Sequence, residues 1–315
     1  MTLINCCSTH VHIRLKFSIS AKMVFSIKLL ICVLASMLIH ILCEPRQSKF
    51  TQACLKWAED SLLTTTMGQK IDELEFLSTA ALFVLNKSMF TPVKFACTAV
   101  LISHKKLITS GHCVSDPIEK IPLFIRFTKD YTDEKDFKDY YVKNFTLHPR
   151  YNNGIDLAIL ELEDVVEFTP KIRPACLLGA DLNYDYSQFE IAFAGFGVGY
   201  FHEDGIKSEG VENKEYAFIN GPLRKISMKK VADASISKDI QGVYDVFTWA
   251  NSNLEGMVCA GDSGGAVQVE YFGGLNMVLG IAKAGNTKEL CSMQTAFINV
   301  TKEQKWIESI AFNDF

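Results

Sequence analysis

The chain has 315 residues, of which 48% are hydrophobic and 22% are charged. At roughly 150 residues per domain, this length corresponds to one large domain or two small ones, and the composition excludes wholesale disorder. The 32 basic and 36 acidic side chains leave a formal net charge of −4. This balance gives no electrostatic reason to expect nucleic acid as a partner.

An apolar run near the N-terminus predicts export. The run extends over residues 29–42 and follows a short basic lead, which is typical of a secretory signal peptide. It is shorter than the roughly 20 residues that cross a bilayer, although extension back to Phe25 leaves a retained membrane anchor as an alternative. We therefore predict a signal peptide over residues 1–43, starting at Met1 or at Met23, and a secreted, extracellular protein.

Removal of this leader leaves an even number of cysteines. In a secreted chain such a set indicates disulfides, whose pairing the spacing does not resolve. These cysteines form no Cys-x-x-Cys or Cys-x-x-His pair, so zinc is disfavoured and we predict no metal or cofactor. Three N-x-S/T sequons, at Asn86, Asn144 and Asn299, fit export, each as a weak signal. The remaining cysteines are Cys54, Cys97, Cys113, Cys176, Cys259 and Cys291.

From about residue 80 onward, short apolar runs alternate with polar turns. Runs of this length between Gly, Asn and Asp predict an all-β barrel or sandwich. Apolar residues at helical spacing predict a terminal helix over 300–310. The charged stretches 129–139 and 202–215 are expected to be solvated loops. The expected strands cover 81–85, 97–102, 106–111, 123–127, 156–162, 189–197, 265–272 and 277–284.

A glycine-rich segment, Gly261-Asp262-Ser263-Gly264-Gly265, lies just before one of these runs. Glycines beside a serine let the backbone turn tightly, so that the hydroxyl is presented and the N–H groups of Gly261 and Ser263 can converge on one point. An oxyanion hole needs this convergence. Taken alone, the segment is equally typical of a turn with an incidental serine.

A serine nucleophile needs a base, and the base needs a carboxylate that orients it. His112 follows an apolar strand and precedes Cys113. Asp156 enters an apolar strand, where burial of its carboxylate is costly without a partner such as a histidine. Singly, these residues would be a packed histidine and a turn-capping aspartate. Their order and contexts together predict a catalytic triad of His112, Asp156 and Ser263.

With these motifs the chain resembles the chymotrypsin-like serine proteases of the trypsin family. The resemblance implies two six-stranded antiparallel β-barrels with a C-terminal helix, an active site between the barrels, and no cofactor. Protein or peptide substrates and protease inhibitors are the implied partners, and a membrane is one only if the leader is retained. The matching segments are FACTAVLISHKKLITSGHC at 95–113, HPRYNNGIDLAIL at 148–160, IRPACLL at 172–178, AGFG at 194–197, CAGDSGGAV at 259–267 and KWIESI at 305–310.

The resemblance also implies three disulfides and a zymogen. The implied pairs are Cys97–Cys113, Cys259–Cys291 and Cys54–Cys176. In this family, cleavage releases an Ile or Val terminus whose ammonium pairs with the Asp before the nucleophile, here Asp262. Cleavage between Lys70 and Ile71 would divide the mature chain into a propeptide-like segment, 44–70, and a peptidase domain, 71–315. Two acidic residues follow Ile71 where the family has small ones, so the sequence leaves this activation open.

The positions expected to bind substrate depart from the family. Met257 stands at the base of the specificity pocket, where cleavage after Lys or Arg needs an anion, and Ala284 and Gly285 leave backbone for pairing with substrate. We therefore predict cleavage after small or medium apolar residues. Lys283 replaces a serine that donates to the triad carboxylate. Its ammonium would either point to solvent or, at about 4 Å and a dielectric of about 20, interact with Asp156 by about 4 kcal/mol.

Two functions follow from these features. The first is a secreted serine endopeptidase that hydrolyses peptide bonds through the predicted triad. The alternative is a catalytically weak or inactive homologue that acts as a binding protein on a protease scaffold. Lys283, Met257 and the altered activation segment motivate the alternative.

Overall fold

The computed structural model describes most of the chain after residue 47, all of it within the unit Ser48–Phe315. The expected leader, the Lys70–Ile71 bond, Asn86 and three pocket positions (Met257, Ala284 and Gly285) lie outside the described residues. No helix among the described residues is long and apolar enough to cross a membrane. The structure describes residues 48, 50–57, 76–85, 93–115, 123–132, 138–177, 179, 189–197, 199–201, 217–219, 221–231, 244–249, 258–270, 275–283, 291–292 and 294–312.

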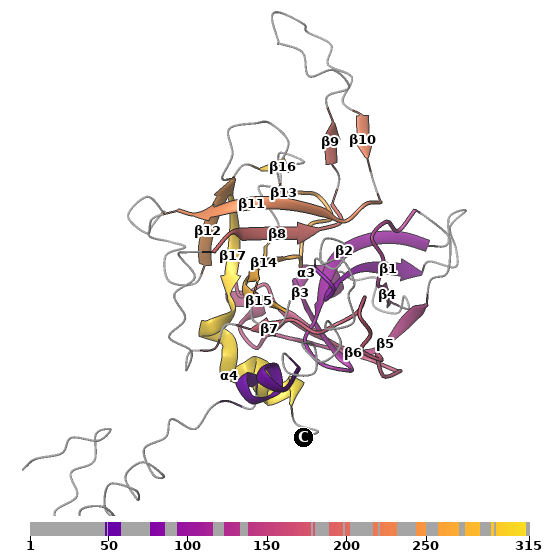
Figure 1. Ribbon diagram of the computed structural model, residues 1–315, viewed down its shortest axis with the longest axis vertical. Helices are drawn as coiled ribbons and strands as arrows, with labels where there is room; N and C mark the ends of the chain where they lie inside the picture. Colours follow the sequence, from indigo (N-terminus) through magenta and orange to yellow (C-terminus); the bar gives the residue numbers. More distant parts are fainter. Residues whose placement is uncertain are drawn as a thin grey trace, which may run out of the picture. The chain divides into compact units, whose positions relative to one another are not determined.

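Six antiparallel strands of the first half form a closed barrel (Figure 1). The strands are β1 (Thr79–Leu85), β2 (Val93–Leu101), β3 (Lys106–Thr109), β4 (Leu123–Arg126), β5 (Asp139–Leu147) and β6 (Ala158–Leu162). They pair in the order β1-β2-β3-β6-β5-β4. Alternate residues of each strand point inward, so Leu82, Leu101 and Leu107 are fully buried in the interior.

The later strands build a second sheet of seven strands. Its members are β7 (Cys176–Leu177), β8 (Ile191–Gly195), β11 (Arg224–Lys230), β12 (Tyr244–Trp249), β14 (Ala266–Glu270), β15 (Asn276–Ala282) and β17 (Gln294–Asn299). The order is β14-β8-β11-β12-β17-β15-β7, and a further pairing of β14 with β15 joins six of the strands in a closed cycle. β7 runs parallel to β15. Phe193, Val267 and Phe297 fill the core of this sheet.

Two short strand pairs stand beside the main sheets. They are formed by β9 (Gly199–Phe201) with β10 (Ala217–Ile219), and by β13 (Val258–Cys259) with β16 (Cys291–Ser292). β13 ends at Cys259, two residues before the glycine-rich segment that contains Ser263, and β16 follows that segment in the chain.

The predicted fold class is confirmed by the closed antiparallel barrel, the second sheet and the terminal helix α4 (Val300–Ala311). Each strand expected from an apolar run overlaps a strand of the structure. Several other strands, including β5 and β11, were not predicted. In β11, only Ile226 and Met228 face the core, and basic residues flank them, so the segment carries no continuous apolar run.

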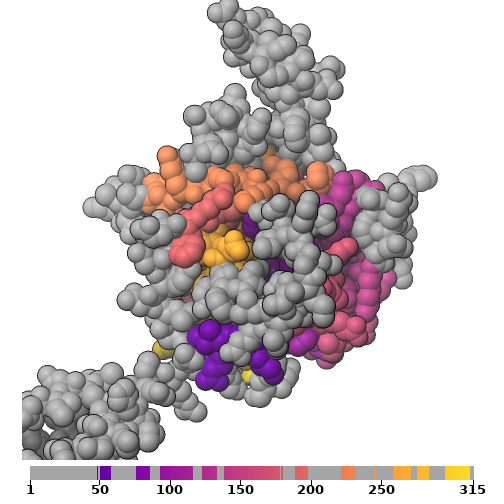
Figure 2. Space-filling model, viewed as in Figure 1, coloured from indigo at the N-terminus to yellow at the C-terminus, as the bar shows by residue number. Residues whose placement is uncertain are grey.

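A helix over residues 50–57 lies in the expected propeptide-like segment and packs on α4. The Oγ of Ser48 caps its first turn by accepting a hydrogen bond from the N–H of Thr51 at 3.0 Å. The ring of Phe50 contacts that of Phe312 with centroids 4.8 Å apart. Figure 2 shows this helix, in indigo, reaching the surface of the folded unit. This helix was not predicted, although its buried residues recur at helical spacing.

Candidate active site

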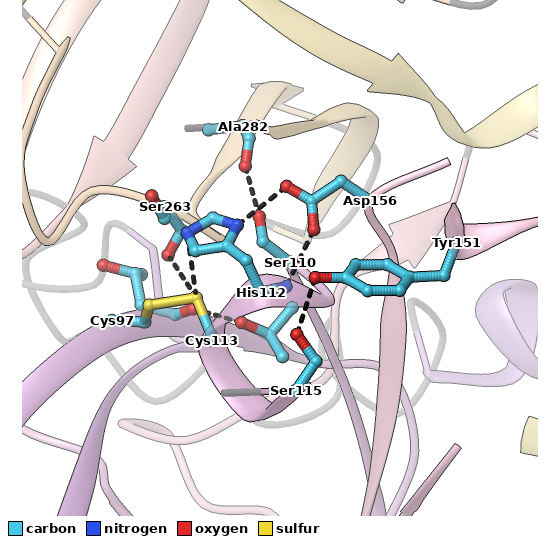
Figure 3. Close-up of polar contacts among 11 residues, drawn as sticks. Cys97, Ser110, His112, Cys113, Ser115, Tyr151, Asp156, Ser263 and Ala282 are labelled. Atoms are coloured by element: carbon cyan, nitrogen blue, oxygen red, sulfur yellow. Dashed lines mark hydrogen bonds and ion pairs between the residues drawn. A yellow bond between two sulfur atoms is a disulfide. The ribbon is translucent and has the colours of Figure 1, made fainter. Parts of the chain in front are cut away.

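The pairing of β3 with β6 brings His112 and Asp156 together. His112 begins a helical turn, α3 (His112–Ser115), soon after β3 ends, and Asp156 lies just before β6 begins. Because Thr109 pairs with Ala158, the end of one strand lies beside the start of the other. The Nδ1 of His112 lies 2.7 Å from the Oδ2 of Asp156, and the backbone N–H of His112 donates to Oδ1 at 2.8 Å (Figure 3).

The electrostatics of this pair suit a histidine base. The Asp156 side chain is 10% exposed and the His112 side chain 34%. Burial raises the pKa of Asp156, but hydrogen bonds from His112, its charge and that of Lys283 outweigh burial and hold the pKa below its ordinary value. An ionised carboxylate at Nδ1 favours the proton on that nitrogen, which leaves Nε2 as the basic atom.

The glycine-rich segment forms a turn held from the first barrel. Gly261 has a φ of 90°, in the left-handed region that glycine adopts without strain. Its carbonyl accepts a hydrogen bond from Thr98 Oγ1 at 3.1 Å, and the Ser263 carbonyl accepts from the N–H of Thr98 at 2.9 Å. Thr98 belongs to β2, so a strand of the first barrel fixes the turn. Figure 3 shows Ser263 beside the imidazole of His112.

Asp262, between the two expected oxyanion donors, is completely buried. Its Oδ1 accepts from the N–H of Gly197 at 2.7 Å, and its Oδ2 accepts from the N–H of Cys259 at 2.8 Å and from Nη2 of Arg224 at 2.7 Å. Burial raises the pKa of Asp262, and the charge of Arg224 and these hydrogen bonds oppose that rise. This carboxylate therefore has a cationic partner within the uncleaved chain.

Two polar residues of the site were not predicted. The hydroxyl of Ser110, two residues before His112, donates to the carbonyl of Ala282 at 2.5 Å and so joins β15 to the first barrel (Figure 3). Arg224 is the second. In the sequence it is one basic residue among several in β11, and no local pattern distinguishes it from its neighbours.

Lys283 directly follows the last residue of β15. Its positive charge is among the influences that lower the pKa of Asp156. Its backbone N–H donates to the carbonyl of Ala296 at 3.0 Å, which continues the pairing of β15 with β17.

The structure contains two of the implied disulfides, Cys54–Cys176 and Cys97–Cys113. Cys259 is also disulfide-bonded, and the backbone of Cys291 lies opposite it in the β13–β16 pair. Cys97, Cys113 and His112 place their ligand atoms within 4.8 Å of one another. Both sulfurs are in the disulfide, so no thiolate is available there to bind a metal.

Of the two described sequons, one is exposed and one caps a helix. Asn144 is exposed on β5. Asn299 precedes α4, where its Oδ1 accepts from the N–H of Lys302 at 3.3 Å and its Nδ2 donates to Asp245 at 2.7 Å. A glycan on Asn299 would modify the nitrogen that binds Asp245.

Comparison with known proteins confirms the resemblance. The chain matches the Trypsin family over residues 79–307. It is 27% identical over 237 residues to the CLIP domain-containing serine protease B15 of Anopheles gambiae, covering 69% of this chain and 61% of that protein. It is also 27% identical over 237 residues to the proclotting enzyme of Tachypleus tridentatus, covering 67% and 57%. With the serine protease Hayan of Drosophila melanogaster it shares 23% identity, covering 69% of this chain and 34% of that protein. The chain thus spans less than two thirds of the length of these relatives.

Proposed function

Because the chain belongs to the trypsin family of serine proteases, we propose that it is a secreted serine endopeptidase with Ser263 as its nucleophile. The observation that carries the proposal is the pair of hydrogen bonds from His112 to Asp156, with Ser263 beside the imidazole (Figure 3). A buried carboxylate, a partly exposed histidine and a serine in a glycine-rich turn provide the three groups that acyl transfer needs.

The reaction uses these groups in two stages. In the first, Ser263 Oγ attacks the peptide carbonyl while Nε2 of His112 takes the hydroxyl proton and returns it to the leaving amine. In the second, water loses a proton to the same nitrogen and hydrolyses the acyl-enzyme, and the proton returns to Ser263. Asp156 holds the imidazole and stabilises its charged form, and the N–H groups of Gly261 and Ser263 bind the oxyanion.

A fluorophosphonate probe tests this assignment because it bonds only to an activated serine. We expect labelling of the processed protein, none of a Ser263→Ala variant, and wild-type labelling of Ser115→Ala. Ser115 is a suitable control because it lies near the site but its hydroxyl contacts Tyr151 at 2.6 Å. A folded protein that stays unlabelled, both intact and after cleavage before Ile71, would refute the enzymatic assignment and leave a binding protein on a protease scaffold.

For specificity, we propose cleavage after small or medium apolar residues. The support is Met257, which provides no anion where a basic side chain would need one. A peptide library should show cleavage after residues such as Ala or Val and little after Lys or Arg. Met257→Asp should shift the preference toward Lys and Arg. The predicted triad is the same in both proteins, so a change in preference can be assigned to the pocket. A preference for Lys or Arg in the unmodified protein would refute the proposal.

For localisation, we propose secretion after removal of residues 1–43. The support is the apolar run of the leader and the disulfides, which persist in oxidising compartments. N-terminal sequencing of protein from the medium should give a terminus near Glu44. Retention of the full leader on the cell surface would instead support the membrane-anchor alternative.

A further inference from the structure

The buried charge beside the nucleophile is neutralised by a residue of the same chain. The Asp262 side chain has no exposed surface, and that of Arg224 is 14% exposed. Their contact, 2.7 Å between Nη2 and Oδ2, is an ion pair formed largely away from water. A carboxylate in such a place needs a cation or a proton, because transfer of an unpaired charge from water is very costly.

Arg224 also connects the carboxylate to the neighbouring strand. Its Nε donates to the carbonyl of Gly197 at 3.1 Å, while the N–H of Gly197 donates to Asp262 at 2.7 Å. A Cβ at Gly197 would collide with the Asp262 carboxyl, so this approach requires glycine. Arg224, Gly197 and Asp262 therefore form a closed set of contacts, in which the guanidinium holds both the carboxylate and the strand segment that faces it.

This set of contacts bears directly on the expected oxyanion hole. In the sequence, Asp262 lies between Gly261 and Ser263, the two residues whose N–H groups would hold the oxyanion. An anchored Asp262 side chain restricts the backbone on both sides of it. The cation that anchors it is therefore also a condition for the turn, because a mobile turn would not hold its two N–H groups toward one point.

We propose that Arg224 is a positioning residue that supplies the cation for Asp262 in the uncleaved chain, so that the turn carrying Ser263 is set without a new N-terminus. The inference rests on the proposed function, since it concerns the nucleophile of that reaction. It departs from the expectation drawn from the resemblance, in which the cation is an ammonium released by cleavage. In this chain, the guanidinium of Arg224 on β11 already provides that cation.

The test compares labelling rates of cleaved and uncleaved full-length protein. An uncleavable form carries Lys70→Gln, and a cleavable form carries Asp-Asp-Asp-Asp-Lys in place of residues 66–70, so that enteropeptidase releases Ile71. A fluorophosphonate probe measures the competence of Ser263 in both. We expect the uncleavable form to be labelled within about threefold of the cleaved one, because the same turn is anchored in each.

Three substitutions in the uncleavable form assign the effect to the guanidinium. Arg224→Gln should slow labelling by about a hundredfold, comparable to the loss of an oxyanion donor. Arg224→Lys should recover the rate to within about tenfold of wild type, because it keeps the charge without the second donor. Lys225→Gln, on the same strand, should label at the wild-type rate. Recovery by lysine separates charge placement from a general loss of packing.

The outcomes distinguish the two proposals. Labelling of the cleaved form alone would overturn the role of Arg224 and leave the proposed function standing, whereas no labelling of either form would contradict the proposed function. Wild-type labelling of a folded Arg224→Gln variant would also overturn the inference. If Arg224→Gln does not fold, the double variant Arg224→Gln, Asp262→Asn leaves no buried charge unpaired. It should fold and label at least about tenfold more slowly, and labelling at the wild-type rate would overturn the inference.

Discussion

Asp156 in the first barrel and Asp262 beside the second sheet are the two buried aspartates of the site. The buried carboxylate of each is paired with a different kind of group. Asp156 is 10% exposed and pairs with His112, which takes part in the proposed reaction. Asp262 has no exposure and pairs with the guanidinium of Arg224, which takes no part in that reaction. In the proposed function, Asp156 orients a reacting group, and Asp262 fixes the backbone that presents the nucleophile.

The difference appears in the pKa values of the two carboxyls. Burial raises both, but at Asp156 the hydrogen bonds and charges of His112 and Lys283 prevail and the pKa lies below its ordinary value. At Asp262 complete burial prevails over Arg224 and two backbone N–H groups, and the pKa lies above it. Burial is thus outweighed at the carboxyl that keeps some exposure and prevails at the carboxyl that keeps none.

The largest effect is expected when the first aspartate loses its charge. Asp156→Asn keeps the shape of the side chain but no longer stabilises the imidazolium or the required tautomer, so kcat for peptide hydrolysis should fall by about 10⁴-fold. The variant should remain folded at the assay temperature, since only the charge of the side chain is lost. Asp139→Asn, whose carboxylate forms an ion pair with Arg126 away from the triad, is the control. A decrease in kcat of less than about tenfold would show that Asp156 does not orient His112 or stabilise its charged form.

Substitution of the second aspartate, Asp262, should lower the stability of the fold and not the reaction rate alone. Asp262→Ala leaves the Arg224 cation without its carboxylate and removes the acceptor of two backbone N–H groups. The free energy of unfolding in urea should fall by about 3 kcal/mol or more. Glu190→Gln, at an exposed pair with Lys225, is the control and should change it by less than about 1 kcal/mol. Equal effects of the two substitutions would remove the contrast drawn between buried and exposed pairs.

The opposite pKa shifts predict opposite dependences on pH. Asp156 has a lowered pKa, so its ionisation stabilises the fold above the ordinary value of 3.8, and this stability is lost as the pH falls through the folded pKa. Asp262 has a raised pKa, so its contribution is present below 3.8 and is lost as the pH rises through the folded pKa. Thermal midpoints measured from pH 3 to about 7 should therefore show a growing cost of Asp156→Asn and a shrinking cost of Asp262→Asn. Parallel trends would contradict the assigned directions.

These comparisons separate what the sequence could predict from what it could not. The apolar runs of the strands and the glycine-rich turn are local patterns. Together with the order of His112, Asp156 and Ser263 in the chain, they predicted the fold class and the contact between His112 and Asp156. The partner of Asp262 could not be found in this way. Arg224 lies 38 residues away in the chain, and its contact depends on the pairing of β11 with β8. The helix over 50–57 could have been predicted from the sequence, because its cap and its apolar spacing are local patterns.

The smallest effect is expected at an ion pair on the surface of the first barrel, which provides a reference for both aspartates. Lys143 lies 3.1 Å from Glu161, and its side chain is 63% exposed. Water screens this charge, and ordering a long side chain costs entropy, so Lys143→Ala should lower the free energy of unfolding by less than about 1 kcal/mol. Urea denaturation with and without added salt measures the difference, which should shrink as salt is raised. A cost as large as that of Asp262→Ala would mean that burial does not control the strength of the charge pairs in this protein.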